Sequence, residues 1–480
     1  MSPLTIIFVV VGYFSLLLCI SYFTSRKADN QAFFLGNKQS PWYVVAFGMI
    51  GASLSGVTFI SVPGWVKSTE FSYMQMVLGY MLGYVVVANI LLPLYYRLNL
   101  TSIYSYLKGR FGEVSYKTGA SFFLLSRTIG ASFRLFLMAN VLQITVFDAW
   151  HVPFALTVLI TILLIWLYTF RGGIKTIIWT DSLQTLFMLL SVGISIYLIM
   201  DKLDLNASGL LNVIRESNYG KVFEFNDWSS KQHFVKQFFT GAFITIVMTG
   251  LDQDMMQKNL SCKNLGEAKK NMYWYGFAFI PANLLFLLLG ALLLMFAQHQ
   301  GIAIPERGDD LFPMLATQHL GPLVGLFFLV GLMAAAYSSA DSALTSLTTS
   351  FTVDILGADE NDELKTSKLR RRSHLLFSFV LLVIIMIFRA INDDSVISAI
   401  FTVAGYTYGP LLGLYAFGLF TKIQVKDKWV PLVTILAPVL CYIFSQNSMD
   451  WFGFNLGFEL LMLNGLLTFM GLLVIRKRNC

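Results

Sequence analysis

The feature that most constrains this chain is a series of apolar segments, each long enough to cross the roughly 30 Å hydrocarbon core of a bilayer. Only 13% of the 480 residues are charged, whereas a soluble domain has about 25%. No polar stretch reaches the roughly 50 residues of a small soluble domain, so we predict one all-α polytopic transmembrane domain over residues 1–480. About thirteen transmembrane helices are expected, at 5–23, 42–66, 74–96, 118–147, 152–170, 174–200, 234–256, 271–297, 318–350, 375–392, 395–420, 429–446 and 454–475.

The distribution of Lys and Arg predicts the orientation of these spans. The first span has no basic start and no small-residue cleavage site after it, so we expect it to be retained, with the N-terminus outside. With this end outside, 24 of the 34 Lys and Arg residues, Lys258 among them, lie on one face and 8 on the other. The positive-inside rule assigns the first face, and with it the C-terminus, to the cytoplasm. We expect a multi-pass protein of the plasma (inner) membrane, whose net charge of +7 needs no nucleic-acid partner.

Glycine and proline interrupt two of the expected spans, which lie five spans apart. The interrupting residues are Gly48, Gly51, Gly56, Pro63 and Gly64 in the second span, and Gly241 and Gly250, with Asp252 just beyond, in the seventh. Interrupted segments at corresponding places in two halves indicate an inverted-repeat transporter with its binding site near the midplane. We predict repeats at 42–201 and 232–421, with an extra N-terminal helix and loop at 1–41 and two C-terminal helices at 422–480.

Ionisable residues within the spans are costly and therefore indicate function. Four are expected here: Arg127, Arg134, Asp181 and Asp341. Asp181 lies within a turn or two of the cytoplasmic end of its span. The alternative to a functional role for it is therefore a helix cap. Each arginine is as well suited to pairing with a carboxylate or a helix end as to binding substrate or gating.

A cluster of hydroxyl groups surrounds the last of these residues. Ser338, Asp341, Ser342 and Thr345 follow i, i+3, i+4, i+7 spacing, which places their oxygens on one helical face. Several oxygen ligands on one face suit a hard cation. Ser and Thr also occur in membrane helices as packing residues, which is the alternative interpretation of this cluster.

The histidines count against an enzyme. All five fall in loops or at span ends: His151, His233, His299, His319 and His374. They form no cluster for a metal site or a catalytic triad, and the chain has no phosphate-binding glycine loop for ATP. We therefore expect a protein that is not an enzyme and whose energy source is an ion gradient.

Five segments carry a resemblance to a known family. They are GASLSGVTFISVPG at 51–64, TSIYSYLKGRFG at 101–112, YTFRGGIKTIIWTDSLQTLF at 168–187, GLDQDMMQKNLSCKN at 250–264 and MAAAYSSADSALTSLTTSFTVDIL at 333–356. Over nearly its whole length the chain resembles the sodium:solute symporters, which include sodium-glucose, proline, sialic acid, iodide and monocarboxylate cotransporters. The resemblance implies a LeuT-type 5+5 inverted repeat, with Na⁺ as the coupling ion.

The resemblance also implies two cation sites. The common sodium site would use the carbonyls of Gly51, Leu54 and Ala335 and the hydroxyls of Ser338 and Ser339. A second cation site, similar to that of some members resembling the sialic acid carrier, would use Asp181, Ser338, Asp341 and Ser342. Asp341 replaces a hydroxyl residue there, and two buried anions need compensation. We therefore expect more than one coupled cation, either two sodium ions or one sodium ion with a proton.

The substrate positions implied by the resemblance are Ser53, Ser55, Thr58, Tyr73, Gln75, Thr245, Met248 and Thr402, to which Arg127 and Arg134 are added as candidates. Sugar carriers have acidic and amide groups at several of these positions, so glucose and galactose are disfavoured. Hydroxyl groups with intramembrane arginines suit a carboxylate-bearing solute, because the guanidinium fork binds a carboxylate bidentately.

The leading hypothesis is a sodium-coupled symporter that imports a small organic solute by alternating access. One alternative is a symporter of the same family for a sugar or another neutral solute. A second is a transport-inactive, sensor-like or channel-like membrane protein with the same fold.

Overall fold

The computed structural model describes residues 3–25, 30–170, 173–206, 219–358, 362–391, 396–453 and 456–477. The β pairing found within these residues consists of two isolated bridges, Ser40–Cys262 and Val425–Arg476, and nearly all the rest is helical. The α-helices are α1 (Pro3–Ser25), α2 (Asn30–Leu35), α3 (Trp42–Ser53), α4 (Gly56–Thr69), α5 (Tyr73–Val86), α6 (Leu92–Arg97), α7 (Ser105–Arg110), α8 (Glu113–Leu142), α9 (Phe154–Thr169), α10 (Ile174–Lys202), α12 (Phe234–Thr245), α13 (Gln253–Leu260), α14 (Leu265–His299), α15 (Leu311–Met314), α16 (Pro322–Ser350), α17 (Glu363–Ile391), α18 (Val396–Phe420), α19 (Val430–Gln446), α20 (Ser448–Phe452) and α21 (Leu460–Val474).

Short π and 3₁₀ turns extend or connect these helices. The π turns are Val87–Leu91, Gln143–Phe147, Ile246–Gly250, Leu315–His319 and Phe351–Ile355. The 3₁₀ turns are Gly36–Lys38, Asp148–Trp150, Gly308–Asp310 and Asp427–Trp429. The π turn at Ile246–Gly250 leads directly into the gap between α12 and α13, so the helix is already distorted where it breaks.

The prediction of a multi-pass helical membrane protein is confirmed. Within the described ranges, nine helical stretches are long and apolar enough to cross a membrane, and two further pairs qualify as bent spans. The pairs are α3 with α4, bent by 55°, and α12 with α13, bent by 64°. They coincide with the two interrupted spans expected at 42–66 and 234–256. Of the remaining expected spans, α9 and α21 have 16 and 15 residues and are short for a crossing, so the number thirteen stays a prediction.

A few expected positions lie outside the described residues. They are the span ends at 392, 395 and 454–455 and the motif residues 171–172.

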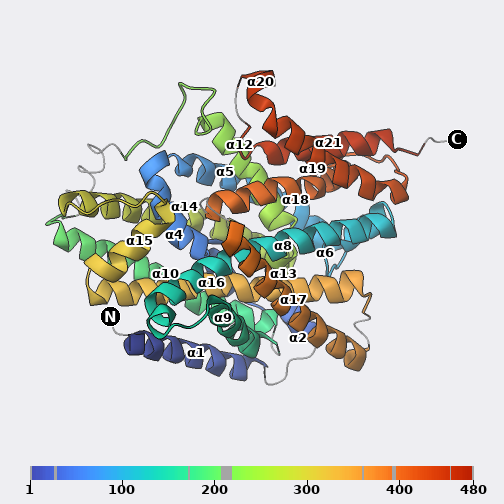
Figure 1. Ribbon diagram of the computed structural model, residues 1–480. Helices are drawn as coiled ribbons and strands as arrows, with labels where there is room; N and C mark the ends of the chain where they lie inside the picture. The colour runs from blue at the N-terminus through green and yellow to red at the C-terminus, as the bar shows by residue number, and fades with distance from the viewer. Residues whose placement is uncertain are drawn as a thin grey trace.

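The helices form an inner bundle and an outer layer. In the most apolar part of α16, 78% of the residues are buried, against 28% in α1 and 22% in α19. In Figure 1, α1 and the group α19 to α21 lie at opposite edges, with α8 and α16 between them. A helix buried on all sides belongs to the core of a membrane bundle, so α16, which carries the hydroxyl cluster, lies at its centre.

The packing partners come in equivalent pairs, as an inverted repeat requires. The first half of the first bent span, α3, packs against α14, and the first half of the second bent span, α12, packs against α5. In the same way α10 packs against α16, and α18 against α8. Each pair maps onto the other when helices α3 to α10 are exchanged with helices α12 to α18. This pattern supports the two predicted repeats, whose limits at 42–201 and 232–421 stay a prediction.

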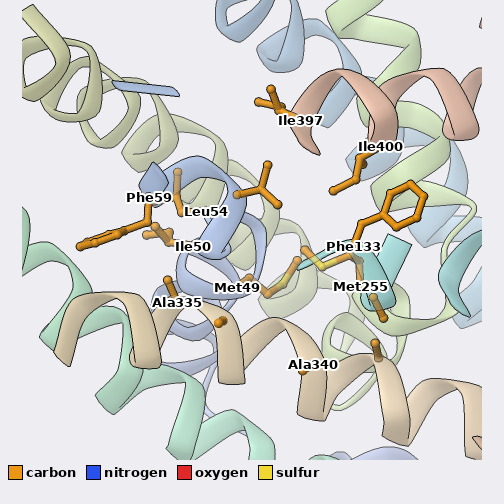
Figure 2. Close-up of a cluster of buried hydrophobic side chains, with 14 of the residues drawn as sticks. Met49, Ile50, Leu54, Phe59, Phe133, Met255, Ala335, Ala340, Ile397 and Ile400 are labelled. Atoms are coloured by element: carbon orange, nitrogen blue, oxygen red, sulfur yellow. The ribbon is translucent and has the colours of Figure 1, made fainter. Parts of the chain in front are cut away.

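Apolar side chains hold the first bent span against the bundle centre. Met49, Ile50, Leu54 and Phe59 from the bent span face Ala335 of α16 in Figure 2, with Met255 of α13 nearby. Leu54 and Phe59 are fully buried. The two breaks and the centre of α16 therefore belong to one packed region.

Candidate cation and solute sites at two helix breaks

The first break interrupts the hydrogen bonds of the bent span at Leu54 and Ser55. The Leu54 amide donates to the Ile50 carbonyl at 2.8 Å, and the next bond beyond the break runs from the Phe59 amide to the Ser55 carbonyl at 3.1 Å. The carbonyls of residues 51–54 lie between these two bonds. They include the predicted sodium ligands Gly51 and Leu54, and an unwound segment of this kind is where transporters of the inverted-repeat class coordinate cations.

Two glycines allow the break to approach its neighbours closely. A Cβ at Gly51 would lie 2.1 Å from the Thr185 hydroxyl on α10, and a Cβ at Gly56 would lie 3.3 Å from the Ala336 Cβ on α16. A side chain at Gly51 would therefore force the two helices apart. The glycines place the freed carbonyls against α10 and α16, the two helices that carry the predicted side-chain ligands.

The two serines of the predicted sodium site have different surroundings. Ser338 is fully buried and donates a hydrogen bond to Asp181 Oδ1 at 2.6 Å. Ser339 is also fully buried, but its Oγ has no hydrogen-bond partner among the described residues. A buried hydroxyl without a partner is costly, and a cation ligand is the role that would satisfy it. The oxygen donors present therefore fit a sodium ion, although membership of the site stays a prediction.

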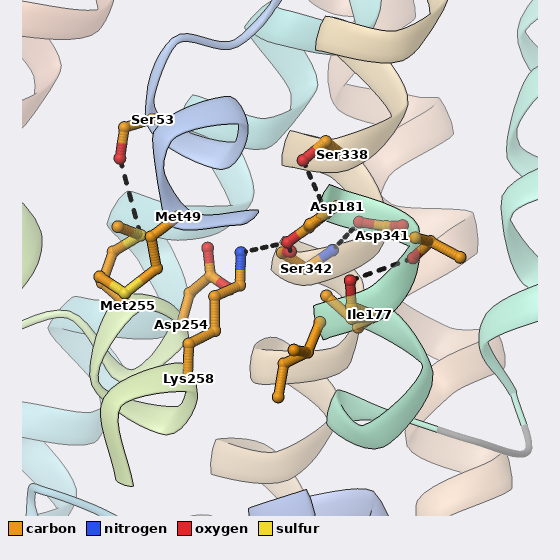
Figure 3. Close-up of polar contacts among 12 residues, drawn as sticks. Met49, Ser53, Ile177, Asp181, Asp254, Met255, Lys258, Ser338, Asp341 and Ser342 are labelled. Carbon is orange, nitrogen blue, oxygen red and sulfur yellow. Dashed lines mark hydrogen bonds and ion pairs between the residues drawn. The ribbon is translucent and has the colours of Figure 1, made fainter. Parts of the chain in front are cut away.

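The second predicted cation cluster centres on Asp181, as Figure 3 shows. Ser338 donates to Oδ1, while the Ser342 hydroxyl approaches Oδ2 at 3.4 Å. Asp341 has separate partners: its Oδ2 accepts from the Tyr168 hydroxyl at 2.8 Å and its Oδ1 from the Ser342 amide at 2.5 Å. The structure thus brings Asp181, Ser338 and Ser342 into direct contact and places the Asp341 carboxylate in a neighbouring hydrogen-bond network.

A lysine that the sequence analysis assigned to the cytoplasmic face is part of this cluster. Lys258 is 1% exposed, and its Nζ lies 2.7 Å from Asp181 Oδ2. All eight residues of α13 are buried, so Lys258 is not a loop residue, and its use in the count of positive charges was wrong. The available signal was its distance of only eight residues from Gly250, which places it on the second half of a broken span.

A cavity of about 100 Å³ lies between the two breaks and contains most of the predicted substrate positions. Those that line it are Ser53, Ser55, Thr58, Tyr73, Arg127, Arg134, Thr245 and Met248. The sequence analysis missed several other lining residues: Ala52, Val57, Tyr80, Tyr84, Ile244, Thr249, Met255, Tyr275, Phe279, Ile397, Ile400 and Phe401. These lining residues come from helices on all sides of the cavity. No local sequence motif predicts which face of each helix points into it.

Hydrogen bonds among tyrosines connect one wall of the cavity. The Ser53 and Tyr275 hydroxyls lie 2.6 Å apart, and the Tyr84 hydroxyl donates to Tyr275 at 2.9 Å. On the same side, the Tyr73 and Tyr80 hydroxyls lie 3.1 Å apart. The cavity therefore combines an apolar wall with a few hydroxyl groups, which is the usual composition of a small-molecule site.

Two predicted substrate residues lie outside this cavity. Gln75 is buried in a different set of contacts, where its amide nitrogen donates to the Gln232 carbonyl at 2.8 Å and its amide oxygen accepts from the Glu224 amide at 3.1 Å. Thr402 lines a second cavity of about 540 Å³. Gln75 thus anchors a loop, because its polar atoms are already occupied.

Aromatic side chains separate the central cavity from this larger one. Tyr73 and Phe401 line both cavities. Trp65 packs against them, with ring centroids 5.6 Å from Tyr73 and 6.3 Å from Phe401, and stacks on Phe458 at 6.4 Å. These four rings form the boundary between the two cavities.

The two intramembrane arginines differ in their partners. Arg127 forms an ion pair with Asp254 and lies 3.9 Å from Asp252 Oδ2. Arg134 lies two turns further along the same face of α8. It is 9% exposed, and its Nε and Nη1 have no hydrogen-bond partner among the described residues. Both line the cavity, but Arg127 is neutralised by protein carboxylates, whereas Arg134 has two buried donors available.

The second break is stabilised by a cap that holds the same ion pair. The Asp252 carboxylate accepts hydrogen bonds from the amides of Asp254 and Met255 at the start of α13, at 2.9 and 3.4 Å. Its other oxygen accepts from the Tyr408 hydroxyl. Asp252 and Asp254 are fully buried, and Arg127 supplies one positive charge against these two carboxylates. This arrangement connects α8, α13 and α18.

Two broken spans facing a central cavity, with equivalent packing of two helical halves, define a secondary transporter of the inverted-repeat class. The sequence profile of the sodium:solute symporter family matches residues 33–426, and the chain belongs to this family. It is therefore a sodium-coupled symporter of a small organic solute and not an enzyme, as the sequence analysis predicted.

Curated relatives agree with this assignment. The chain is 24% identical over 468 residues to the sodium/sialic acid symporter NanT of Aliivibrio fischeri, an alignment that covers 93% of this chain and 89% of NanT. It is 28% identical over 442 residues to the sodium-dependent multivitamin transporter of Oryctolagus cuniculus, with 87% and 67% covered. It is also 26% identical over 438 residues to the sodium-coupled monocarboxylate transporter 2 of Bos taurus, with 85% and 67% covered.

Solved structures confirm the LeuT-type fold. The substrate-bound, outward-open structure of a Na⁺-coupled sialic acid symporter superimposes with a TM-score of 0.83 at 18% identity, covering 99% of both chains. Mhp1, a nucleobase-cation-symport-1 family transporter, superimposes in its closed conformation with a TM-score of 0.55 at 14% identity, covering 91% of this chain and 92% of Mhp1.

Proposed function

We propose that this symporter imports a carboxylate-bearing solute, which Arg134 binds in the central cavity. The observation that carries this proposal is the unsatisfied guanidinium: Arg134 lines the cavity, and its buried Nε and Nη1 have no hydrogen-bond partner among the described residues. An isolated buried charge is unfavourable, and a carboxylate would compensate this charge and supply an acceptor that the protein does not. Arg127 is not the anchor, because Asp254 already occupies it.

The hydroxyl groups of the cavity complete the proposed solute site. Ser53, Ser55 and Thr58 lie at the first break and line the same cavity as Arg134. Polar groups of a solute would bind there, while Ile397, Ile400 and Phe401 contact its apolar surface. Two groups of relatives are named for sialic acid and for monocarboxylates, and both kinds of solute carry a carboxylate. A neutral sugar would leave the Arg134 charge uncompensated.

Sodium is proposed to bind on the other side of the same break. Its ligands are the carbonyls of Gly51, Leu54 and Ala335 and the hydroxyls of Ser338 and Ser339. Residues 51–55 then contribute carbonyls to the sodium site and hydroxyls to the solute site. Each ligand would favour the conformation of this segment that the other one needs, and such differential affinity is sufficient for coupling.

A second coupled cation is proposed at Asp181, Ser338, Asp341 and Ser342. Asp181 and Asp341 are both fully buried, and two carboxylates in one region need more than one positive charge. The second cation is either a sodium ion or a proton.

The proposed function is tested by measuring the melting temperature of the purified protein with sugars, amino acids, sialic acids and monocarboxylates, with and without sodium. A ligand that binds the folded state raises its stability, and we expect sodium-dependent stabilisation by a carboxylate. The stabilising solute should enter proteoliposomes under an inward sodium gradient, which a transport-inactive protein would not allow. Stabilisation by sugars alone would contradict the carboxylate assignment. A Hill coefficient of one for sodium at every pH, without proton uptake, would contradict the second cation.

The proposed orientation places the N-terminus outside and the C-terminus in the cytoplasm, in the plasma (inner) membrane. The excess of Lys and Arg on one face supports it, and removing Lys258 from that count leaves 23 against 8. In a variant without the native cysteines, a cysteine introduced at Ser2 should react with a membrane-impermeant thiol reagent in intact cells. Reaction of a cysteine introduced at Asn479, and not of the one at Ser2, would reverse the orientation.

A further inference from the structure

The carboxylate at the centre of the proposed second cation site already has a positively charged partner from the protein. Lys258 of α13 forms an ion pair with Asp181 of α10 at 2.7 Å. The side chains of the two residues are 2% and 0% exposed. Figure 3 shows the ammonium group aimed at the same Asp181 oxygen that Ser342 approaches. The pair therefore lies inside the proposed site.

A sodium ion and the ammonium group cannot both occupy this position without strong repulsion. Asp181 Oδ1 accepts from Ser338, and Oδ2 contacts both Ser342 and Lys258. A cation bound by Asp181, Ser338 and Ser342 would have to use the oxygen that Lys258 holds. Two unit charges about 4 Å apart repel strongly in a low-dielectric interior. Binding of the second cation therefore requires Lys258 to leave Asp181.

Lys258 has one other carboxylate within reach on its own helix. Asp254 and Lys258 are separated by four residues in α13, a spacing that places both side chains on one helical face. Asp254 Oδ1 is buried and has no hydrogen-bond partner among the described residues, while Oδ2 pairs with Arg127. Figure 3 shows the Asp254 carboxylate beside the Lys258 side chain. Because α13 is buried on all sides, a displaced ammonium group would move to this carboxylate rather than to water.

We propose that Lys258 is a tethered cation that holds the place of the second coupled cation at Asp181 and moves to Asp254 when that cation, a sodium ion, binds. This inference rests on the proposed second cation site. Displacement of Lys258 would change the contact between two helices as well as the local charge. The ion pair joins α10 to α13, the second half of the second broken span, so sodium binding at Asp181 would release α13 from α10. One cation would thereby loosen the cytoplasmic half of the transporter.

The test is a sodium titration of the melting temperature of purified Lys258→Met, with N-methylglucamine keeping the ionic strength constant. Without a competing ammonium group, the half-saturating sodium concentration should fall about tenfold or more below that of the wild type, since truncating one partner of a buried pair leaves an uncompensated charge. The variant should be less stable than the wild type without sodium and should recover in sodium. The matched control is Lys263→Met, an exposed lysine five residues along, whose titration should equal that of the wild type.

Two further variants keep the proposal falsifiable if Lys258→Met folds poorly. Lys258→Met combined with Asp181→Asn removes both charges and should lose the gain in sodium affinity. Asp181→Asn alone should reduce the Hill coefficient for sodium to one. An unchanged half-saturating concentration in Lys258→Met, or a protein that sodium cannot rescue, would overturn the proposal. These results differ from failure of the symporter assignment itself. In that case sodium would not stabilise the wild-type protein, and a sodium gradient would not drive solute uptake by it.

Discussion

Arg134→Gln is expected to reduce the affinity for the carboxylate solute by about 100-fold or more, because losing one partner of a buried, hydrogen-bonded charge pair costs about 2–5 kcal/mol. Arg134→Lys keeps the charge but not the bidentate fork, so we expect a smaller loss of about tenfold. The measurement is the concentration dependence of the melting temperature, with the carboxylate that stabilises the wild type.

The free protein provides an internal control for this prediction. Nε and Nη1 of Arg134 have no hydrogen bonds to lose among the described residues, and the substitution removes a buried charge. Without solute, Arg134→Gln should therefore melt at or above the wild-type temperature and keep its stabilisation by sodium. Arg389→Gln, on the exposed part of α17, is the matched variant outside the cavity and should bind solute normally. Normal affinity in Arg134→Gln would exclude Arg134 as the anchor.

Ser339→Ala is expected to abolish sodium-driven uptake at ordinary sodium concentrations. The Oγ of Ser339 is buried without a partner among the described residues, so its removal breaks no hydrogen bond seen in the protein. Hydrogen bonds to charged groups contribute about 1.5–3 kcal/mol, and we take a ligand contact of a hydroxyl with a cation to be of similar size. The half-saturating sodium concentration should then rise roughly 10- to 100-fold. It is measured by uptake into proteoliposomes and by the sodium dependence of the melting temperature.

A neighbouring serine on the same helix supplies the control. Ser346 is 1% exposed, but its Oγ donates to the Ala343 carbonyl at 3.0 Å, so it is already satisfied within the helix. Ser346→Ala should leave the sodium dependence unchanged. If Ser339→Ala transports with wild-type sodium dependence while correctly folded, Ser339 is not a sodium ligand. If both variants lose activity together, the loss reflects packing of α16.

The membrane class and the broken spans could be predicted because their causes are local. A long run of apolar residues is stable only in lipid or in the core of the helix bundle. Clustered glycines weaken a helix wherever it lies. The breaks expected within 42–66 and 234–256 accordingly match the bends at Leu54–Ser55 and Leu251–Asp252. The helical face shared by Ser338, Asp341 and Ser342 was partly predictive, since two of these side chains converge on Asp181 and the third bonds to Tyr168.

The partners of the charged residues could not be predicted, because they come from distant parts of the chain. Arg127 and Arg134 have the same residue type and lie on one helix, yet only Arg127 meets a carboxylate from α13. Lys258 belongs to a short polar segment typical of a cytoplasmic loop, and it is buried because that segment continues the second bent span within the bundle. Gln75 matched a substrate position in the sequence, whereas the surrounding loop binds both of its amide atoms.

By itself, then, the sequence determined that the chain spans a membrane, that two spans break, and that oxygen-rich segments lie near the breaks. These properties depend on hydrophobicity and helical periodicity, which act over a few turns. The tertiary structure alone decided which buried charges are paired and which are available. Pairing depends on distances of a few ångströms between α8, α10, α13 and α16, and in a low-dielectric interior those distances determine whether a charge is neutralised or left to bind a ligand.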